Sequence, residues 1–368
     1  MIKKLTIFII LGLLTIGIVF ISGCVQEKAP AQPNESITPA PATSLATPEQ
    51  TAVIQNTSQP VVPKGTSDPD IIVDIYNPDK AWTGTTLFAD LHKIENPRII
   101  EVNMKGEIVW EYRIPDNLKQ YTNPGLDTER LPNNNILFVL PRKGVYEVNR
   151  NGTIVWSYLD PKIDHDADRL PNGNTLFVFG NNDWINDAQV KEVNPKGELV
   201  WAWYAKDHFD APVDSGREGW THTNAVTRLS NGNTLISLRN FGYIVEVDPK
   251  GVVVKTIGKG ILSDQHDPEI LPNGNILVAQ PGKPAPSAIE IDPNNNKIVW
   301  EYVPEKVPHI RDADRLPNGN TLVVSAARII EVTPDKEVVW QLTVKGITPS
   351  QGKVQPTYLY QAERINPN

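Results

Sequence analysis

The stretch Arg-Leu-Pro-Asn-Gly-Asn-Thr-Leu occupies residues 169–176 and returns unchanged at residues 315–322. Close variants lie at residues 130–137, 228–235 and 270–277. The Pro-Asn-Gly core of the two identical copies favours a tight turn, because proline fixes φ and glycine accepts positive φ at low cost. Similarity that returns at such intervals indicates a repeat architecture.

The repeat unit around residues 166–203 contains four segments with the character of strands. Residues 167–170 and 175–179 flank the Pro-Asn-Gly-Asn turn, and residues 190–193 and 199–203 flank a second turn rich in Asn, Pro and Gly. Their β-branched and aromatic side chains favour extended backbone. Four antiparallel strands per unit are typical of a propeller blade, so the sequence predicts an all-β fold.

Six blades follow from the spacing of the repeat. One asparagine of the turn marks five full units, and its copies lie 39 to 59 residues apart. A sixth unit, residues 85–112, lacks a first strand, whereas residues 360–365 resemble a first strand with no turn after it. We therefore expect a six-bladed β-propeller that the C-terminal strand closes, which removes exposed sheet edges. The tryptophans that recur near the end of each unit except the fourth are expected to pack between blades: Trp110, Trp156, Trp201, Trp300 and Trp340.

The N-terminal residues have the character of a targeting segment. Two lysines precede an apolar run over residues 5–21, and Ile21-Ser22-Gly23-Cys24 resembles the lipobox of lipoproteins, with Cys24 the sole cysteine of the chain. We expect a lipoprotein signal peptide over residues 1–23 and a lipid on Cys24. The alternative is an uncleaved anchoring helix. Both interpretations place the rest of the chain outside the cytoplasm, at the cell surface or in the periplasm.

The remaining boundaries follow from composition. Residues 24–66 are rich in Pro, Thr and Ser and predict a disordered linker, and residues 67–368 form the propeller domain. The net charge of −8 and the lack of any basic run argue against a nucleic-acid partner. The linker would hold the propeller away from the membrane to which the lipid attaches the protein.

All six histidines of the chain fall in loops that a propeller places on one face. His92 lies between second and third strands, and the others, His165, His208, His222, His266 and His309, lie between consecutive blades. The Asn-Gly turns belong to the opposite face. We therefore expect the face with the histidines to carry the function, because loops on a rigid scaffold commonly do so.

The repeat also locates the residues at the mouth of the central channel. Five positions before the leucine of each turn, the innermost strands carry residues that should converge near the axis: Leu126, His165, Asn224, His266, Arg311 and Tyr360. His222 lies two positions farther out, and Arg239 ends a second strand on the same face. A long insertion over residues 205–221 contributes His208, Phe209, Arg217 and Trp220. Together with Trp184, it predicts an aromatic wall around a ligand, or alternatively a plug of the channel mouth.

Three segments, Asp264-Gln-His266-Asp, His222-Thr-Asn224-Ala-Val and Ser237-Leu-Arg239-Asn, resemble the aryl sulfate sulfotransferase family. The resemblance spans about residues 80–367 and implies a six-bladed propeller outside the cytoplasm that moves a sulfuryl group from an aryl sulfate to a phenol. It assigns the nucleophile to His266, which becomes transiently sulfated. It assigns sulfuryl binding and protonation of the leaving phenoxide to His222 and Arg239, and it makes His165 a further pocket histidine.

The residues themselves suit this chemistry. A sulfuryl group carries charged oxygens, much as a transferring phosphoryl group does, and arginine offers a rigid fork of donors that is always charged. Neutral imidazole serves as a nucleophile or a proton carrier near pH 7. We expect Trp184, Trp220, Asn224 and Arg311 to bind substrate. The expected partners are small aromatic sulfates and phenols, and no cofactor or metal is expected.

Other interpretations remain open at this point. The propeller could be a non-catalytic surface module that binds a glycan or a protein. A propeller that binds pyrroloquinoline quinone is a weaker alternative, since such rings usually have eight blades. The repeated carboxylates Asp166, Asp168, Asp267, Asp312 and Asp314 could hold Ca²⁺, although their occurrence in step with the blades favours a structural role at strand starts.

Overall fold

Residues 65–122, 126–180, 183–210, 218–281, 285–347 and 359–366 are described by a computed structural model of the chain. They belong to one compact unit, Thr47–Asn368. Cys24, the predicted signal peptide, nearly all of the predicted linker and Arg217 lie outside these residues. Within the described part of the chain, no helix combines the length and the hydropathy needed to cross a membrane.

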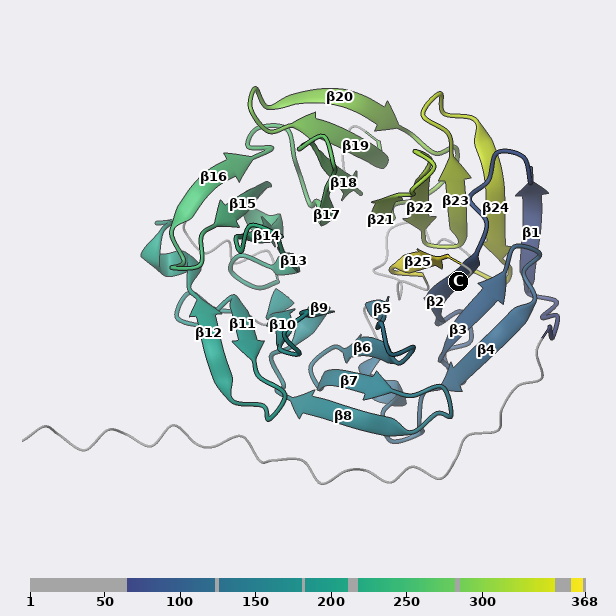
Figure 1. Ribbon diagram of the computed structural model, residues 1–368, viewed down its shortest axis with the longest axis horizontal. Helices are drawn as coiled ribbons and strands as arrows, with labels where there is room; N and C mark the ends of the chain where they lie inside the picture. The colour runs from purple at the N-terminus through teal and green to yellow at the C-terminus, as the bar shows by residue number, and fades with distance from the viewer. Residues whose placement is uncertain are drawn as a thin grey trace, which may run out of the picture. The chain divides into compact units, whose positions relative to one another are not determined.

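Six antiparallel sheets surround a central axis, with the first strand of each blade innermost (Figure 1). The C-terminal strand supplies the innermost strand of blade 1, and blades 2 and 3 follow in chain order. The strands of blades 1 to 3, from the axis outward, are β25 (Ala362–Ile365), β2 (Thr85–Asp90), β3 (Arg98–Asn103) and β4 (Ile108–Arg113); β5 (Thr128–Arg130), β6 (Ile136–Leu140), β7 (Gly144–Val148) and β8 (Ile154–Leu159); and β9 (Asp164–Arg169), β10 (Thr175–Val178), β11 (Val190–Val193) and β12 (Leu199–Trp203).

Blades 4 to 6 repeat this order, and short 3-10 helices occur only in connections among the described residues: η1 (Lys119–Tyr121), η3 (Ala205–Asp207) and η4 (Arg239–Phe241). The strands of these blades are β13 (Thr223–Arg228), β14 (Thr234–Leu238), β15 (Tyr243–Val247) and β16 (Val253–Ile257); β17 (His266–Ile270), β18 (Ile276–Gln280), β19 (Ser287–Asp292) and β20 (Lys297–Tyr302); and β21 (Ile310–Arg315), β22 (Thr321–Ser325), β23 (Arg328–Val332) and β24 (Val338–Val344).

The predicted closure of the ring is confirmed, because β25 pairs antiparallel with β2. Arg364 on β25 fixes this strand to blade 6: its Nη1 lies 3.0 Å from Glu331 Oε2, and its guanidinium lies 4.4 Å from the centre of the Trp340 ring. Both ion-pair side chains are fully buried. The pairing of the two ends of the propeller therefore depends on a buried charge pair as well as on strand hydrogen bonds.

One strand of the structure was not predicted from the sequence. Residues Ile71–Tyr76 form β1, which pairs antiparallel with β24 and adds a fifth strand to the outer edge of blade 6. Figure 1 shows β1 beside β24 at the place where the chain enters the ring. This segment contains no copy of the repeat, so the periodicity that located the other strands gave no signal here.

The repeat residues link neighbouring blades. In blade 3, Asn174 of the turn donates to Glu192 on β11 at 2.6 Å, and the other carboxylate oxygen of Glu192 receives Arg228 of blade 4 at 2.7 Å. The same guanidinium lies 5.2 Å from the centre of the Trp201 ring. Equivalent Asn, Glu and Arg side chains connect blades 2 and 3, 5 and 6, and 6 and 1.

The recurrent tryptophans bridge blades, with one correction. Their indole nitrogens donate to a backbone carbonyl in the next blade, as Trp110 does to Arg150 at 3.0 Å. In blade 3 this bond comes from Trp203, which is buried, rather than from the predicted Trp201. Blade 3 therefore uses both of its tryptophans, one for the hydrogen bond and one for the cation–π contact.

Candidate active site

A small cavity lies where the innermost strands begin, on the face that carries the histidines. Its lining includes five of the six residues that the repeat placed at the channel mouth, since Leu126 is the exception and is fully buried. The lining residues are Asp127, His165, Asp166, Asn224, His266, Asp267, Arg311, Tyr360 and Gln361. The offset from the turn leucine therefore located this cavity from the sequence.

The backbone around the cavity adopts left-handed conformations that are uncommon outside glycine. His165 has φ of 61° and His222 of 49°, and Asp264 and Asp267 have φ of 56° and 45°. In blade 3 the conformation coincides with a break in register between β9 and β10. Such residues cost on the order of 1–3 kcal/mol each and concentrate at functional sites, where surrounding contacts hold them in place.

His165 and His222 contact each other directly. Their Nε2 atoms lie 3.1 Å apart, so one nitrogen carries a hydrogen and the other accepts it. Nδ1 of His222 lies 2.9 Å from the Glu218 carbonyl oxygen and 3.2 Å from Arg239 Nη1. One neighbour accepts and the other donates, so each neutral tautomer of His222 has a partner. This arrangement allows His222 to exchange a proton through Nε2.

His266 is held in a single tautomer. Its Nδ1 lies 2.7 Å from the carbonyl oxygen of Asp264, which can only accept, so Nδ1 carries the hydrogen. The lone pair on Nε2 faces Arg311, whose Nη1 lies 2.7 Å away. Burial, and secondarily the charges of Arg311 and Arg239, hold the pKa of His266 well below its usual value. The imidazole is therefore neutral near pH 7 and carries a lone pair, as a nucleophile requires.

His222 is kept neutral for similar reasons. Burial lowers its pKa well below the usual value, and the neighbouring His165 and Arg239 lower it further. Arg239 begins η4, directly after β14, and its Nη2 lies 3.4 Å from Asp264 Oδ1. The structure thus brings the four predicted residues near one another, since the ring centres of His165 and His266 lie 6.4 Å apart. Of the four, His165 and His266 line the cavity, whereas His222 and Arg239 lie behind His165 and Asp264.

Gly180 provides the space that His165 occupies. A Cβ atom on this residue would lie 2.1 Å from Nδ1 of His165 and 3.0 Å from the Cβ of Asp164. Both neighbours are buried, so neither has room to withdraw. The repeat gave no reason for a glycine at this position.

Asp183 is a residue of the site that the sequence analysis missed. Its carboxylate accepts backbone N–H groups of Thr221 at 3.0 Å and His222 at 3.1 Å, and the hydroxyl of Thr221 at 2.6 Å. It also accepts the backbone N–H of Trp220 at 2.9 Å. Asp183 thereby fixes the segment that presents His222. It lies in an irregular loop of blade 3, so the repeat gave no signal for it.

The two tryptophans expected in an aromatic wall lie outside the cavity lining. Trp184 is 63% exposed and Trp220 is 2% exposed, and neither lines the cavity. Trp220 packs instead against Phe241, with ring centres 5.3 Å apart. Tyr360 supplies the aromatic surface, because its ring centre lies 5.9 Å from that of His165 and 6.1 Å from that of His266. Trp220 belongs to a hydrophobic cluster that includes Val226 and Ile236 of blade 4, so its side chain is buried there and does not line the channel.

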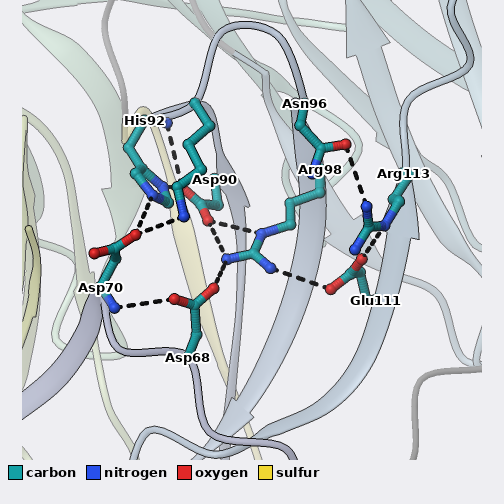
Figure 2. Close-up of polar contacts among 9 residues, drawn as sticks. Asp68, Asp70, Asp90, His92, Asn96, Arg98, Glu111 and Arg113 are labelled. Carbon is teal, nitrogen blue, oxygen red and sulfur yellow. Dashed lines mark hydrogen bonds and ion pairs between the residues drawn. The ribbon is translucent and has the colours of Figure 1, made fainter. Parts of the chain in front are cut away.

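The remaining histidines have other surroundings. His208 stacks on Trp203, with ring centres 5.4 Å apart, and His309 is not part of the cavity lining. His92 belongs to an ionic cluster with Asp90, Asp70 and Lys93 beside β1, which Figure 2 shows. A shared face therefore did not mean a shared site.

The carboxylates of the innermost strands mainly join blades. Asp127 accepts the backbone N–H of Ala167 in the next blade at 3.0 Å, and Asp312 accepts that of Ala362 at 2.9 Å. Burial and then mutual repulsion raise the pKa values of the clustered carboxyls, among them Asp166, Asp168 and Asp314. These contacts favour the structural role over the Ca²⁺ site. Among the described residues, Asp267, Asp312 and Asp314 have oxygens within 4.8 Å of one another, close enough to share a cation.

Comparisons with known proteins were made against families, curated proteins and solved structures. The family model described as arylsulfotransferase (ASST) matches residues 76–265, just over half of the chain. This range includes His165, His222 and Arg239 and ends one residue before His266. No curated protein matches the chain.

Two solved structures illustrate the likeness in fold. A protein of unknown function from Bacteroides caccae is 20% identical with a TM-score of 0.53, and the alignment covers 76% of this chain and 98% of that one. Virginiamycin B lyase from Staphylococcus aureus is 13% identical with a TM-score of 0.47, covering 77% and 89%. At these identities the first likeness concerns the fold alone, and the second carries no further weight.

Proposed function

This chain belongs to the arylsulfotransferase family, and on that premise we propose that it transfers a sulfuryl group from an aryl sulfate to a phenol through a sulfated His266. One arrangement supports the proposal above all. The Nε2 lone pair of a neutral, buried His266 faces a cavity that also holds a guanidinium and a second histidine. Such a site binds an anionic group and offers a nucleophile to its centre.

In the first half of the reaction, Nε2 of His266 attacks the sulfur atom of the donor. The N–S bond forms as the bond between sulfur and the aryl oxygen breaks, and the electron pair leaves on the phenoxide oxygen. The carbonyl of Asp264 retains its hydrogen bond to Nδ1–H and so stabilises the positive charge that develops on the ring. Arg239 and Arg311 bind sulfuryl oxygens.

His222 moves the proton in both halves. An anionic donor beside His222 raises its pKa, so the ring takes a proton from solvent when the donor binds. This proton passes from Nε2 to the phenoxide as it leaves. In the second half, the acceptor phenol returns a proton to His222 while its oxygen attacks sulfur and releases His266. Nε2 of His222 contacts His165, which lines the cavity, and among the described residues the Oδ1 atom of Asn224 has no partner and can accept from the acceptor phenol.

The test is turnover of a chromogenic aryl sulfate with a phenol as acceptor. We expect His266→Ala to lose at least about a thousandfold of the rate, as is usual when a covalent nucleophile is removed. His208→Ala is the matched control, because His208 lies on the same face but outside the cavity. Incubation with donor alone should add the mass of one sulfuryl group to the peptide that contains His266. Full activity in His266→Ala would exclude His266 as the nucleophile, and a lack of turnover in the unsubstituted protein would favour the non-catalytic surface module that the sequence also allowed.

We further propose that a lipid on Cys24 holds the propeller at the outer face of the cytoplasmic membrane. The support is the lipobox-like sequence alone. Cys24→Ser should abolish metabolic labelling with a radioactive fatty acid. Equal labelling of both forms would exclude Cys24 as the attachment site.

A further inference from the structure

The guanidinium of Arg311 is hydrogen-bonded to Nε2 of His266, the atom that the proposed reaction needs as its nucleophile. Nη1 of Arg311 donates to Nε2 of His266 at 2.7 Å, while Nδ1–H of the same ring is bound to the Asp264 carbonyl. Both ring nitrogens are therefore engaged. A nucleophile whose lone pair accepts a charge-assisted hydrogen bond cannot attack until that bond breaks.

Arg311 also has no ion-paired carboxylate among the described residues. Its Nε has no hydrogen-bond partner among them either. The charge of Asp264 acts on Arg311, but that carboxylate is ion-paired with Arg239. The hydroxyl of Tyr360, which also lines the cavity, has no hydrogen-bond partner in the described structure. A partly buried cation without an ion-paired anion is costly, and the cost is reduced when an anion binds it directly.

These two observations lead to one mechanism. We propose that Arg311 caps the reactive nitrogen of His266 while the site is empty, and that an oxyanion entering the cavity draws the guanidinium off that nitrogen and takes it as a ligand. The same event would thus bind the donor and uncover the nucleophile. The identity of the oxyanion as an aryl sulfate rests on the proposed function, whereas the capping of His266 does not.

Capping would protect the protein from side reactions. A neutral imidazole with an available lone pair reacts with any small electrophile that reaches it, but a hydrogen-bonded lone pair does not. Arg239 does not share this role, because its Nη1 lies beside Nδ1 of His222 and its Nη2 beside Asp264. The cap is therefore specific to Arg311 and His266.

The experiment measures the reactivity of His266 toward diethyl pyrocarbonate, located by peptide mass spectrometry. We expect Arg311→Gln to speed carbethoxylation of His266 by about tenfold or more, the factor for loss of one hydrogen bond to a charged group. The exposed His208 serves as the internal reference in each sample, and Arg113→Gln, a partly exposed arginine paired with Glu111, is the control variant.

A second measurement separates a cap from a structural role. Calorimetric titration with inorganic sulfate should show affinity at least about tenfold weaker in Arg311→Gln. Arg311→Lys should retain part of the sulfate affinity and part of the protection, and it replaces the glutamine variant if that variant does not fold. Unchanged His266 reactivity, or unchanged sulfate binding, in a folded variant would overturn the proposal. Neither readout requires turnover, so an absence of sulfotransferase activity would refute the proposed function without contradicting the capping of His266 by Arg311.

Discussion

The Nε2 atoms of His165 and His222 lie 3.1 Å apart, although 57 positions separate the two residues in the sequence. His165 lies at the start of β9 in blade 3 and His222 directly precedes β13 in blade 4, so the two neighbouring inner strands bring these side chains together. This contact joins the residue that Gly180 accommodates to the residue that Asp183 holds. It makes the geometry of the pair sensitive to residues that never touch a substrate.

Gly180→Ala should lower activity while the propeller remains folded. The added Cβ would meet His165 Nδ1 at 2.1 Å, so the imidazole must leave its position beside His222. We expect kcat/KM for an aryl sulfate to fall by about a hundredfold, as misplacement of about 1 Å can cause. Gly173→Ala is the matched control, since its φ of 86° lies in a turn on the opposite face. It should lower the melting temperature without changing kcat/KM per folded molecule, and the opposite pattern would refute this account.

The acid limb of the pH–rate profile should lie below pH 6.5. His266 must be neutral to attack, and burial with the charge of Arg311 holds its pKa well below the usual value. Activity should therefore persist as pH falls through 6.5 and disappear only when His266 becomes protonated in the folded protein. The measurement is kcat/KM for the free enzyme between pH 4 and 9. A limb above 6.5 would show that a group other than a depressed histidine controls the rate.

His92→Gln should destabilise the protein in mildly acidic solution and less so in alkaline solution. Hydrogen bonds and charge attraction from Asp90 outweigh burial and raise the pKa of His92 in the folded state. A raised pKa contributes stability that is complete below the unfolded value of about 6.5 and is lost as pH rises through the folded value. Urea unfolding of both proteins at pH 5.5 and pH 9 checks this. An equal difference at the two pH values would contradict the linkage.

Arg364→Met should weaken closure of the ring. The substitution leaves Glu331 buried without its cation and removes the contact with Trp340. Breaking a buried pair by removal of one partner costs about 3–5 kcal/mol. Denaturant unfolding should show this loss, whereas Arg113→Met, whose side chain is about half exposed, should change stability by less than about 1 kcal/mol. Similar small effects in both variants would mean that strand pairing alone closes the propeller.

The repeat allowed much of the fold to be predicted. Residues equivalent to Asn174, Glu192 and Arg228 occur at the same strand positions in other blades, because neighbouring blades are joined by the same contacts. Strand β1 departs from that periodicity, and so it could not be seen. The Trp203 correction has a related cause: Trp201 and Trp203 are two positions apart on one strand and share a face, so only packing against the next blade decides which one donates.

By itself the sequence determined the ring, its closure, and the positions at the channel mouth, because blade periodicity and a fixed offset from the turn translate directly into place. Tertiary structure alone decided the contacts within the site. The tautomer of His266, the cap by Arg311, the burial of Trp220 and the support from Asp183 each depend on side chains from different blades and loops meeting at one point. No local pattern encodes such meetings, since they follow from packing and from the cost of burying unpaired polar groups.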